Sequence, residues 1–341
     1  MSTTDPRPAA PPATFAGLPM PRDPQALIDR SRRPIVRTPT GEPRFPFPVP
    51  NGWFIVAEAR DLMPGETRAL YVFGRDVVLF RGADGAPHMV EAYCAHLGAH
   101  LGAGGRVEGD CIRCPFHGWL YDGDSGKCEE IPYGDMDRIP TQAKVRSFPC
   151  LERNEMIWAW HHGEDGEPFY DVPDIPELRD DEWLPYEIVE FDVATCCQEM
   201  AENNVDFAHF MYVHGTDAIP DDDFFVDGAY KRTIGSGGNF VREGFGLGLG
   251  VLRVKGYTTF FSSTTPIDEE NVKVRWVFTS PAANGPDAAR QAAEQFSAGV
   301  SQDLPIWENK RYVERPVVTK SEKKLLEQRQ WAKQFYSNYD G

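Results

Sequence analysis

Short runs of alternating apolar and polar residues fill the chain from residue 52 to about residue 163. The runs are WFIVAEA, ALYVFG, DVVLFRG, HMVEAYC, CIRCPF and WLYDG, and turn-forming sequences such as PGE, GADG and GDSG separate them. Alternation with a period of two, bounded by Gly and Pro, is typical of short antiparallel strands. The pattern predicts a small antiparallel β domain at residues 46–165. We interpret His161 and His162, near its end, as a surface pair.

The pattern changes after a polar, Pro-containing connector at residues 164–185. A strand-like YEIVEFDV precedes a helical segment and β-rich stretches from about 225 to 280. Helical periodicity runs from residue 287 to the end, with a break near Pro316. This order predicts an α+β domain, similar to a helix-grip fold, with C-terminal helices at residues 166–341. Within it, GFGLGLG at 244–250 predicts a strand that lines or backs a cavity.

Composition narrows the possible classes of function. Residues 1–45 are rich in Pro and Ala, which predicts a largely disordered arm or one that lies over the body. The formal net charge of −17 argues against nucleic acid or an anionic membrane as a main partner. The seven cysteines show no disulfide spacing, no segment has the apolar length of a membrane span, and the N-terminus lacks a secretory signal. We expect a soluble, cytoplasmic protein.

The first candidate site combines Cys94-x-His96 with Cys114-x-x-His117, seventeen residues further on. Two thiolates and two imidazoles suit zinc in general. The two short spacings, in loops rich in Gly and Pro, are better suited to a cluster of two metals in which each pair gives one ligand to each metal. A zinc knuckle using Cys111 and Cys114 is the alternative. Cys111 lies in an apparent strand at residues 110–113, so we expect it to be a small buried side chain.

This motif, C-A-H followed by C-P-F-H-G-W, resembles the Rieske motif. The resemblance implies a [2Fe–2S] cluster in which Cys94 and Cys114 bind one iron and His96 and His117 bind the other. Such a cluster transfers one electron at a time.

A second candidate site lies in Asp206-x-x-His209-x4-His214. Two His and a carboxylate can hold non-haem iron and leave coordination positions open. On one ideal helix His209 and His214 would point roughly 140° apart, at about 100° per residue. They can meet one ion only if the helix ends or bulges between them, and Gly215 is consistent with such an ending.

The longer motif E-N-x-x-D-x-x-H-x4-H resembles the catalytic-iron motif of Rieske non-haem iron oxygenases. The resemblance implies that His209 and His214 bind mononuclear Fe(II). It also implies that Asp206 bridges this site to the Rieske His of a neighbouring subunit, and that Asn203 lines the iron site.

In that family the third iron ligand is a carboxylate far downstream, for which Asp303 is the candidate. Phe296, Val300, Asp303 and Trp307 fall on one face of a helix. A carboxylate on this apolar face needs a partner, which a metal supplies. The alternative is that Pro305 breaks the helix and exposes Asp303; Glu294 and Glu308 are weaker candidates.

The body of the chain most resembles the steroid-acting branch of these oxygenases, which includes 3-ketosteroid 9α-hydroxylase and cholesterol 7-desaturase. The sequences that carry the resemblance are AYCAHLGAHLGAGGRVEGD, NNVDFAHFMYVHG and DLPIWENKRY. It implies a homotrimeric terminal oxygenase that uses O2 to hydroxylate a steroid or other polycyclic apolar molecule. NADH would act only through a separate flavin and iron–sulfur reductase.

The sequence is also compatible with other functions. A sterol 7-desaturase, an aromatic-ring dioxygenase or an O-demethylase could use the same scaffold. From different classes, a non-catalytic Rieske electron carrier would need neither His209 nor His214, and a zinc-stabilised interaction module would be colourless.

Overall fold

The computed structural model describes residues 43–134, 138–215, 217 and 223–339. It also describes the backbone of a short pair of strands, β1 (Thr14–Phe15) and β2 (Leu18–Pro19). The predicted arm at residues 1–45 lies almost wholly outside the described residues.

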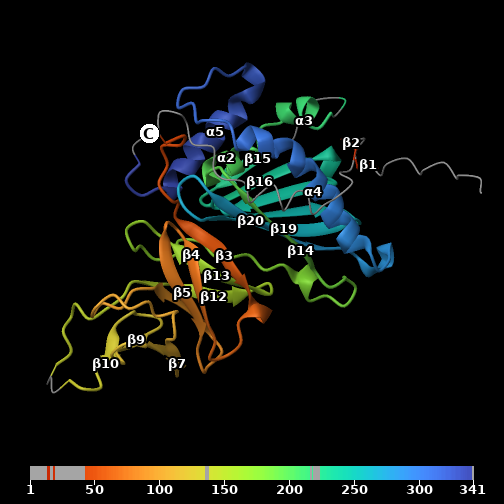
Figure 1. Cartoon of the computed structure of the whole chain (residues 1–341). Coiled ribbons are helices and arrows are strands. Elements are labelled where there is room, and N and C mark those ends of the chain that lie inside the picture. Colours follow the sequence, from red (N-terminus) through yellow and green to blue (C-terminus); the bar gives the residue numbers. More distant parts are fainter. Residues whose placement is uncertain are drawn as a thin grey trace, which may run out of the picture.

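The N-terminal half contains three small antiparallel sheets, which confirms the predicted fold of short strands (Figure 1). Their orders are β10-β9-β8-β7, β11-β6-β5-β4 and β12-β13-β3. The strands are β3 (Gly52–Glu58), β4 (Thr67–Val72), β5 (Arg75–Arg81), β6 (Pro87–Glu91), β7 (Arg106–Glu108), β8 (Cys111–Arg113), β9 (Leu120–Asp122), β10 (Cys128–Glu130), β11 (Ser147–Phe148), β12 (Cys150–Arg153) and β13 (Met156–His161).

Strand β5 separates two apolar cores. Val77 and Leu79 belong to a core that continues into the C-terminal half, whereas Val78 and Phe80 belong to the core beneath the β7–β10 sheet. Because successive side chains of a strand point to opposite faces, one unbroken apolar run can serve both cores.

The C-terminal half is a seven-stranded antiparallel sheet covered on one face by helices (Figure 1). The order is β14-β20-β19-β18-β17-β16-β15, which confirms the predicted α+β fold. The elements are β14 (Glu187–Val193), β15 (Asp223–Asp227), β16 (Tyr230–Gly235), β17 (Phe240–Phe245), β18 (Leu249–Val254), β19 (Thr258–Pro266), β20 (Val272–Thr279), α2 (Cys197–Glu202), α3 (Ala208–Tyr212), α4 (Ala288–Trp307) and α5 (Lys323–Ala332).

Two details of this half differ from the sequence prediction. The 244–250 stretch is not one strand, because β17 ends at Phe245 and a turn through Gly246, at φ 63°, leads to β18 at Leu249. The C-terminal helices are also separated by a longer non-helical segment than the predicted break at Pro316. That segment runs from the end of α4 to a short 3-10 helix at Lys320–Glu322.

The two halves are joined along β3. The N–H of Ile55 donates to Ser263 Oγ at 3.0 Å, and its carbonyl accepts from Thr265 Oγ1 at 2.7 Å and from Arg275 at 2.8 Å. Nearby, the N–H of Trp53 donates to the Tyr170 hydroxyl at 3.1 Å. The seven-stranded sheet and the loop before it therefore bind the outward backbone groups of β3.

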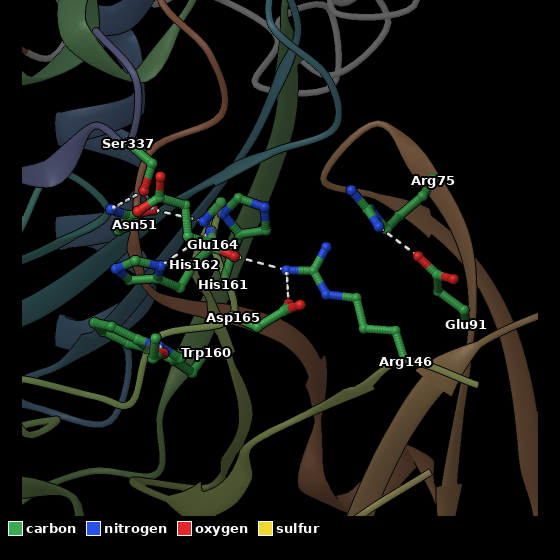
Figure 2. Close-up of polar contacts among 12 residues, drawn as sticks. Asn51, Arg75, Glu91, Arg146, Trp160, His161, His162, Glu164, Asp165 and Ser337 are labelled. Carbon is green, nitrogen blue, oxygen red and sulfur yellow. Dashed lines mark hydrogen bonds and ion pairs between the residues drawn. The ribbon is translucent and has the colours of Figure 1, made fainter. Parts of the chain in front are cut away.

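A polar network extends this junction, and Figure 2 shows it around His161. His161 Nδ1 donates to the Pro50 carbonyl at 3.0 Å, and the amide of Asn51 donates to Ser337 Oγ at 3.1 Å. His161 is only 3 % exposed, so the expectation of a surface pair is wrong for it. Burial lowers its pKa to about 4, which keeps the ring neutral at physiological pH. The prediction used only the neighbouring sequence, whereas the residues that cover His161 are distant in sequence.

Candidate functional site

Two turns of matching geometry form the tip of the N-terminal half. In the first, Cys94 N–H bonds the Ala99 carbonyl at 2.9 Å and Gly98 N–H bonds the Cys94 carbonyl at 2.9 Å. In the second, the equivalent bonds from Cys114 to Trp119 and from Gly118 to Cys114 measure 2.8 and 3.2 Å. Both glycines have positive φ, at 72° and 74°, which explains why each turn needs Gly four residues after its Cys.

The four predicted cluster ligands come together at this tip. Cys94 and Cys114 are buried beneath the turns, while the rings of His96 and His117 lie nearer the surface with centroids 4.6 Å apart. His96 stacks on Trp119 at 4.7 Å, and its Nδ1 is buried with no hydrogen-bond partner among the described residues. An unpaired buried nitrogen is costly, so this atom fits the role of a ligand.

The donor set fits a two-iron cluster better than a single zinc ion. A single ion needs three or four ligand atoms close together, and no three of these Cys and His side chains meet within 4.8 Å among the residues that the structure describes. A [2Fe–2S] centre instead separates the sulfur and nitrogen ligands onto different irons. The alternative of a zinc knuckle is therefore not supported. Cys111 lies in β8 as expected, although it is half-buried rather than buried.

The sulfur of Cys94 has a neighbour that sequence reasoning missed. The hydroxyl of Tyr121, on β9, lies 3.1 Å from Cys94 Sγ and also accepts the Ala95 N–H at 3.2 Å. Burial, followed by the bond to Cys94, raises the pKa of Tyr121 far above its usual range. The hydroxyl therefore keeps its proton for the sulfur. Tyr121 stands only as part of WLYDG in the sequence, which gives no sign of this contact.

The second site forms where α3 ends. Helix α3 stops at Tyr212, and Gly215 has φ 70°, so His214 lies beyond the helix. This ending brings the rings of His209 and His214 to a centroid distance of 5.1 Å. The predicted helix break between the two His residues is confirmed.

Asp303 reaches the same place from α4. Its carboxylate Oδ2 lies 3.4 Å from His214 Nε2, and the residue is 6 % exposed. Helix α4 continues through Pro305 to Trp307, so the alternative in which Pro305 exposes Asp303 is wrong. Val300 and Trp307 are buried on the same face, as the periodicity predicted.

Hydrogen bonds orient both imidazoles so that Nε2 faces Asp303. His209 Nδ1 donates to the Asp206 carbonyl, and His214 Nδ1 donates to Gln302 Oε1 at 2.8 Å. Ligand atoms of His209, His214 and Asp303 all lie within 4.8 Å of one another. Fixing a ring through its second nitrogen is how proteins prepare His as a metal ligand. Gln302 was missed because a polar residue on a helix carries no such signal in sequence.

The electrostatics of the pair suit a cation. His209 Nε2 is buried without a partner among the described residues. Burial lowers the pKa of His209, which keeps a lone pair available. Burial alone would also lower the pKa of His214, but the hydrogen bonds to Asp303 and Gln302 reverse this and raise it. Two imidazoles and one carboxylate leave positions open for further ligands on iron.

Two other predicted residues stand beside the site. The Asp206 carboxylate lies 4.0 Å from His209 Nδ1 and is 45 % exposed at its side chain, so it faces both the metal ligand and the surface. Asn203 directly follows α2 and is half-buried. Within the described residues, no hydrogen bond joins its side chain to the three ligands, and its lining of the iron site stays a prediction.

A pocket lies between α2 and the helix-covered face of the sheet. Gly244, Gly250 and Ser262 are register partners across β17, β18 and β19, so three small residues form one row on this face. The pocket is also lined by Arg242, whose guanidinium lies 5.6 Å from the ring of Phe210. That ring is 4.3 Å from the ring of His209, which places the pocket beside the metal-ligand site.

Family models match both halves of the chain. Residues 52–149 match the Rieske [2Fe-2S] domain, and residues 159–336 match the 3-Ketosteroid 9alpha-hydroxylase C-terminal domain. The cholesterol 7-desaturase of Caenorhabditis elegans is 32 % identical, over 84 % of this chain and 77 % of that protein. The oxygenase component of 3-ketosteroid-9-alpha-monooxygenase from Rhodococcus rhodochrous is 28 % identical, over 84 % of this chain and 83 % of that protein.

Solved structures show the same fold. NdmB of Pseudomonas putida CBB5 superposes with a TM-score of 0.68 at 22 % identity, covering 82 % of this chain and 89 % of that chain. Dicamba monooxygenase bound to dicamba gives 0.63 at 20 % identity, over 84 % and 96 % of the two chains.

A tip built for a [2Fe–2S] cluster and a sheet that holds a buried two-His, one-carboxylate site define the terminal component of a Rieske non-haem iron oxygenase. The chain belongs to the family that contains the oxygenase component of 3-ketosteroid 9α-hydroxylase and the cholesterol 7-desaturases. It is an oxidoreductase whose cofactors are the Rieske cluster and a mononuclear iron, with O2 as co-substrate. None of the helices in the described part of the chain has the length and apolar composition of a membrane span.

Proposed function

We propose that this oxygenase hydroxylates a steroid, inserting one atom of O2 in a reaction like that of 3-ketosteroid 9α-hydroxylase. One observation carries the proposal: residues 159–336, the half that holds the candidate iron ligands and the pocket, match the C-terminal domain of that enzyme. In the balanced reaction the substrate C–H becomes C–OH, and the second oxygen atom leaves as water with two electrons and two protons.

The proposed roles follow the geometry of the two sites. His209, His214 and Asp303 hold the mononuclear iron, and Cys94, His96, Cys114 and His117 hold the cluster. The iron supplies O2 binding and reduction, and the cluster supplies electrons one at a time. Gln302 and the Asp206 carbonyl keep the two imidazoles oriented. We divide the chain into an arm at 1–45, a Rieske domain at 46–165 and a catalytic domain at 166–341.

Asp206 is proposed to connect the iron site to the cluster of a neighbouring subunit in a homotrimer. Figure 1 supports transfer between subunits, because the β7–β10 sheet and the helices α3 and α4 lie at opposite ends of one chain. Leu97 and Phe116 are largely exposed beside His96 and His117. Exposed apolar side chains beside the cluster ligands suit a surface that docks on another protein.

The row of small residues in the pocket is proposed to admit the substrate. Gly250 leaves space on the sheet face beside Ser262, whereas the aliphatic chain of Lys231 lies over Gly244. We propose that Asn203 lines the iron side of this space.

A separate flavin and iron–sulfur reductase is proposed to supply electrons from NADH. The location that we propose is the cytoplasm. The seven cysteines all lie within the described residues and form no disulfide, in keeping with a reducing compartment.

A steroid panel tests the proposed function. The iron-loaded protein would be incubated with a surrogate reductase, NADH and O2, and products would be analysed by mass spectrometry. We expect 3-keto-4-ene steroids to gain one oxygen atom. Conversion of aromatic controls without any steroid turnover would contradict the steroid assignment while leaving the oxygenase class intact.

Sterol desaturation is a second candidate, favoured by the 32 % identity with a cholesterol 7-desaturase. In that reaction the substrate loses two hydrogen atoms, and with two electrons and two protons from the reductase and solvent both oxygen atoms leave as water. Including 3-hydroxy sterols in the panel separates the two reactions, because desaturation lowers the product mass and hydroxylation raises it.

A further inference from the structure

Three turns of the N-terminal half gather acidic side chains around one buried histidine, away from both sites described above. His88 lies on β6 with a side chain only 4 % exposed. Asp84 comes from the β5–β6 turn, Asp110 from the β7–β8 turn and Asp124 from the β9–β10 turn. Ligand atoms of Asp84, His88 and Asp110 all lie within 4.8 Å of one another.

The imidazole of His88 is oriented as metal-ligating histidines are. Its Nδ1 lies 2.9 Å from Asp124 Oδ1, and its ring stacks on Phe80 with centroids 5.2 Å apart. A carboxylate accepts only, so Nδ1 donates to Asp124 and Nε2 is the nitrogen left to face a cation. Carboxylate, histidine and metal in series form a recurring arrangement around bound ions.

The opposite nitrogen has no partner. His88 Nε2 is buried and makes no hydrogen bond with any described residue, although two carboxylates are near. Leaving such an atom unsatisfied in the interior is unfavourable in general. The spacing is too long for a hydrogen bond to Asp84 or Asp110. It is suited to ligand atoms on either side of a cation, each about 2.0–2.2 Å from zinc.

Gly82 leaves room where these atoms converge. A Cβ on Gly82 would lie 2.4 Å from Asp110 Oδ1, 3.0 Å from His88 Nε2 and 3.1 Å from Asp84 Oδ1. All three ligand atoms therefore point at one small volume that no side chain from residue 82 can occupy.

We propose that Asp84, His88 and Asp110 bind a divalent transition-metal cation of the zinc type, as a structural site. One imidazole with two carboxylates is a ligand set that zinc accepts, whereas calcium and magnesium take oxygen ligands. The ion joins the β5–β6 turn to the β7–β8 turn, and so fastens the cluster-bearing sheet to the sheet below it. One backbone bond already joins the same two turns, from Ala83 N–H to the Gly109 carbonyl at 2.9 Å.

The test compares zinc binding by iron-loaded wild type, Asp84→Asn/Asp110→Asn and a control, Asp61→Asn/Glu129→Gln. The Asn variants keep the Oδ1 acceptors for Ala86 N–H and Asp84 N–H. The control removes two exposed carboxylates from the same half. All three proteins keep the candidate iron ligands, so any difference in bound zinc reports on this site.

After equilibrium dialysis against zinc, we expect metal analysis to find one more zinc per chain in the wild type and the control than in Asp84→Asn/Asp110→Asn. Zinc should also raise Tm by a few degrees only in the first two proteins. Equal zinc content in all three would overturn the proposal. If the double Asn variant fails to fold, an anomalous-difference map of zinc-soaked wild-type crystals decides: a peak at His88 Nε2 supports the site, and its absence rejects it.

Discussion

His214 Nε2 and Asp303 Oδ2 lie 3.4 Å apart, although one follows α3 and the other lies on α4. Both residues are buried, and the ring centroid of His209 lies 5.1 Å from that of His214. A buried carboxylate between two imidazoles is stabilised when a cation shares it. Because of this contact, substitution of Asp303 is the most direct test of the iron-site assignment.

Replacing Asp303 by Ala should remove the mononuclear iron and spare the cluster. We expect iron content to fall by one atom per chain and turnover by more than about 100-fold, because the site loses its only anionic ligand. The visible spectrum of the cluster should be unchanged. Glu294→Ala is the matched control, since Glu294 lies on the same helix but pairs with Arg290 at the surface. Retained iron and activity in Asp303→Ala would assign the third ligand elsewhere.

Asp206→Asn should keep both metals and slow turnover by about 10–100-fold, the range typical of residues that support a metal ligand. The substitution preserves the backbone carbonyl that holds His209 and removes only the carboxylate charge. Single-turnover oxidation of the reduced cluster would measure the loss directly. Asp227→Asn, on an exposed strand end, should behave as wild type. Loss of the mononuclear iron from Asp206→Asn would instead make Asp206 a ligand.

Tyr121→Phe should make the reduction potential of the cluster more negative, on the order of 50 mV for a bond worth about 1 kcal/mol. A hydrogen bond to Cys94 Sγ favours the reduced state, which carries the extra negative charge. Redox titration followed by visible spectroscopy measures the shift. Tyr133→Phe is the control, because the Tyr133 hydroxyl bonds Trp119 rather than a sulfur. An unchanged potential in Tyr121→Phe would mean that this hydroxyl does not tune the cluster.

Gly250→Val should lower kcat/KM for a steroid by roughly ten-fold or more while both metals stay bound. The Cβ of the new valine would lie 3.0 Å from Ser262 Oγ, and its two methyl groups would occupy pocket space beside the row of small residues. Ser262→Ala widens the same row and should retain activity. Steady-state kinetics on one converted steroid compares them. Equal kinetics for wild type and Gly250→Val would place the substrate in another pocket.

His161 should make the protein sensitive to acid. The unfolded chain protonates this residue near its ordinary pKa of about 6.5, whereas the folded chain does so only near 4. The contribution of His161 to the free energy of unfolding is therefore complete above about pH 7 and declines as pH falls toward 4. At pH 5 the loss should be about 2 kcal/mol.

Urea unfolding at pH 7.5 and pH 5, followed by tryptophan fluorescence, measures that loss. His161→Gln removes the titration and keeps a donor for the Pro50 carbonyl, so its stability should differ less between the two pH values. His162→Gln alters the neighbouring, less buried ring and should keep the acid sensitivity of the wild type. An identical pH dependence in His161→Gln and wild type would contradict the assignment to this residue.

The sequence predicts those parts of the molecule whose signals are local. Ligand spacing identifies Cys94 and His96, and Gly215 marks the helix end that lets His214 turn toward His209. The family resemblance suggested Asp303, and helical periodicity placed it on a buried face. Contacts between distant segments were not predictable in this way. Gln302, Tyr121 and the burial of His161 each depend on partners brought together only by the tertiary fold.

Strand β3 lies at the edge of its three-stranded sheet, with its outer backbone groups turned away from β13. Exposed edge strands invite pairing with other chains, and proteins protect them with charges, bulges or a covering segment. Here the outward N–H and carbonyl of Ile55 form hydrogen bonds with the side chains of Ser263, Thr265 and Arg275. These edge groups therefore have partners without an added strand. The C-terminal half of the chain thus protects the N-terminal half from aggregation. A cluster-binding fragment expressed alone would expose this strand edge to pairing with other chains.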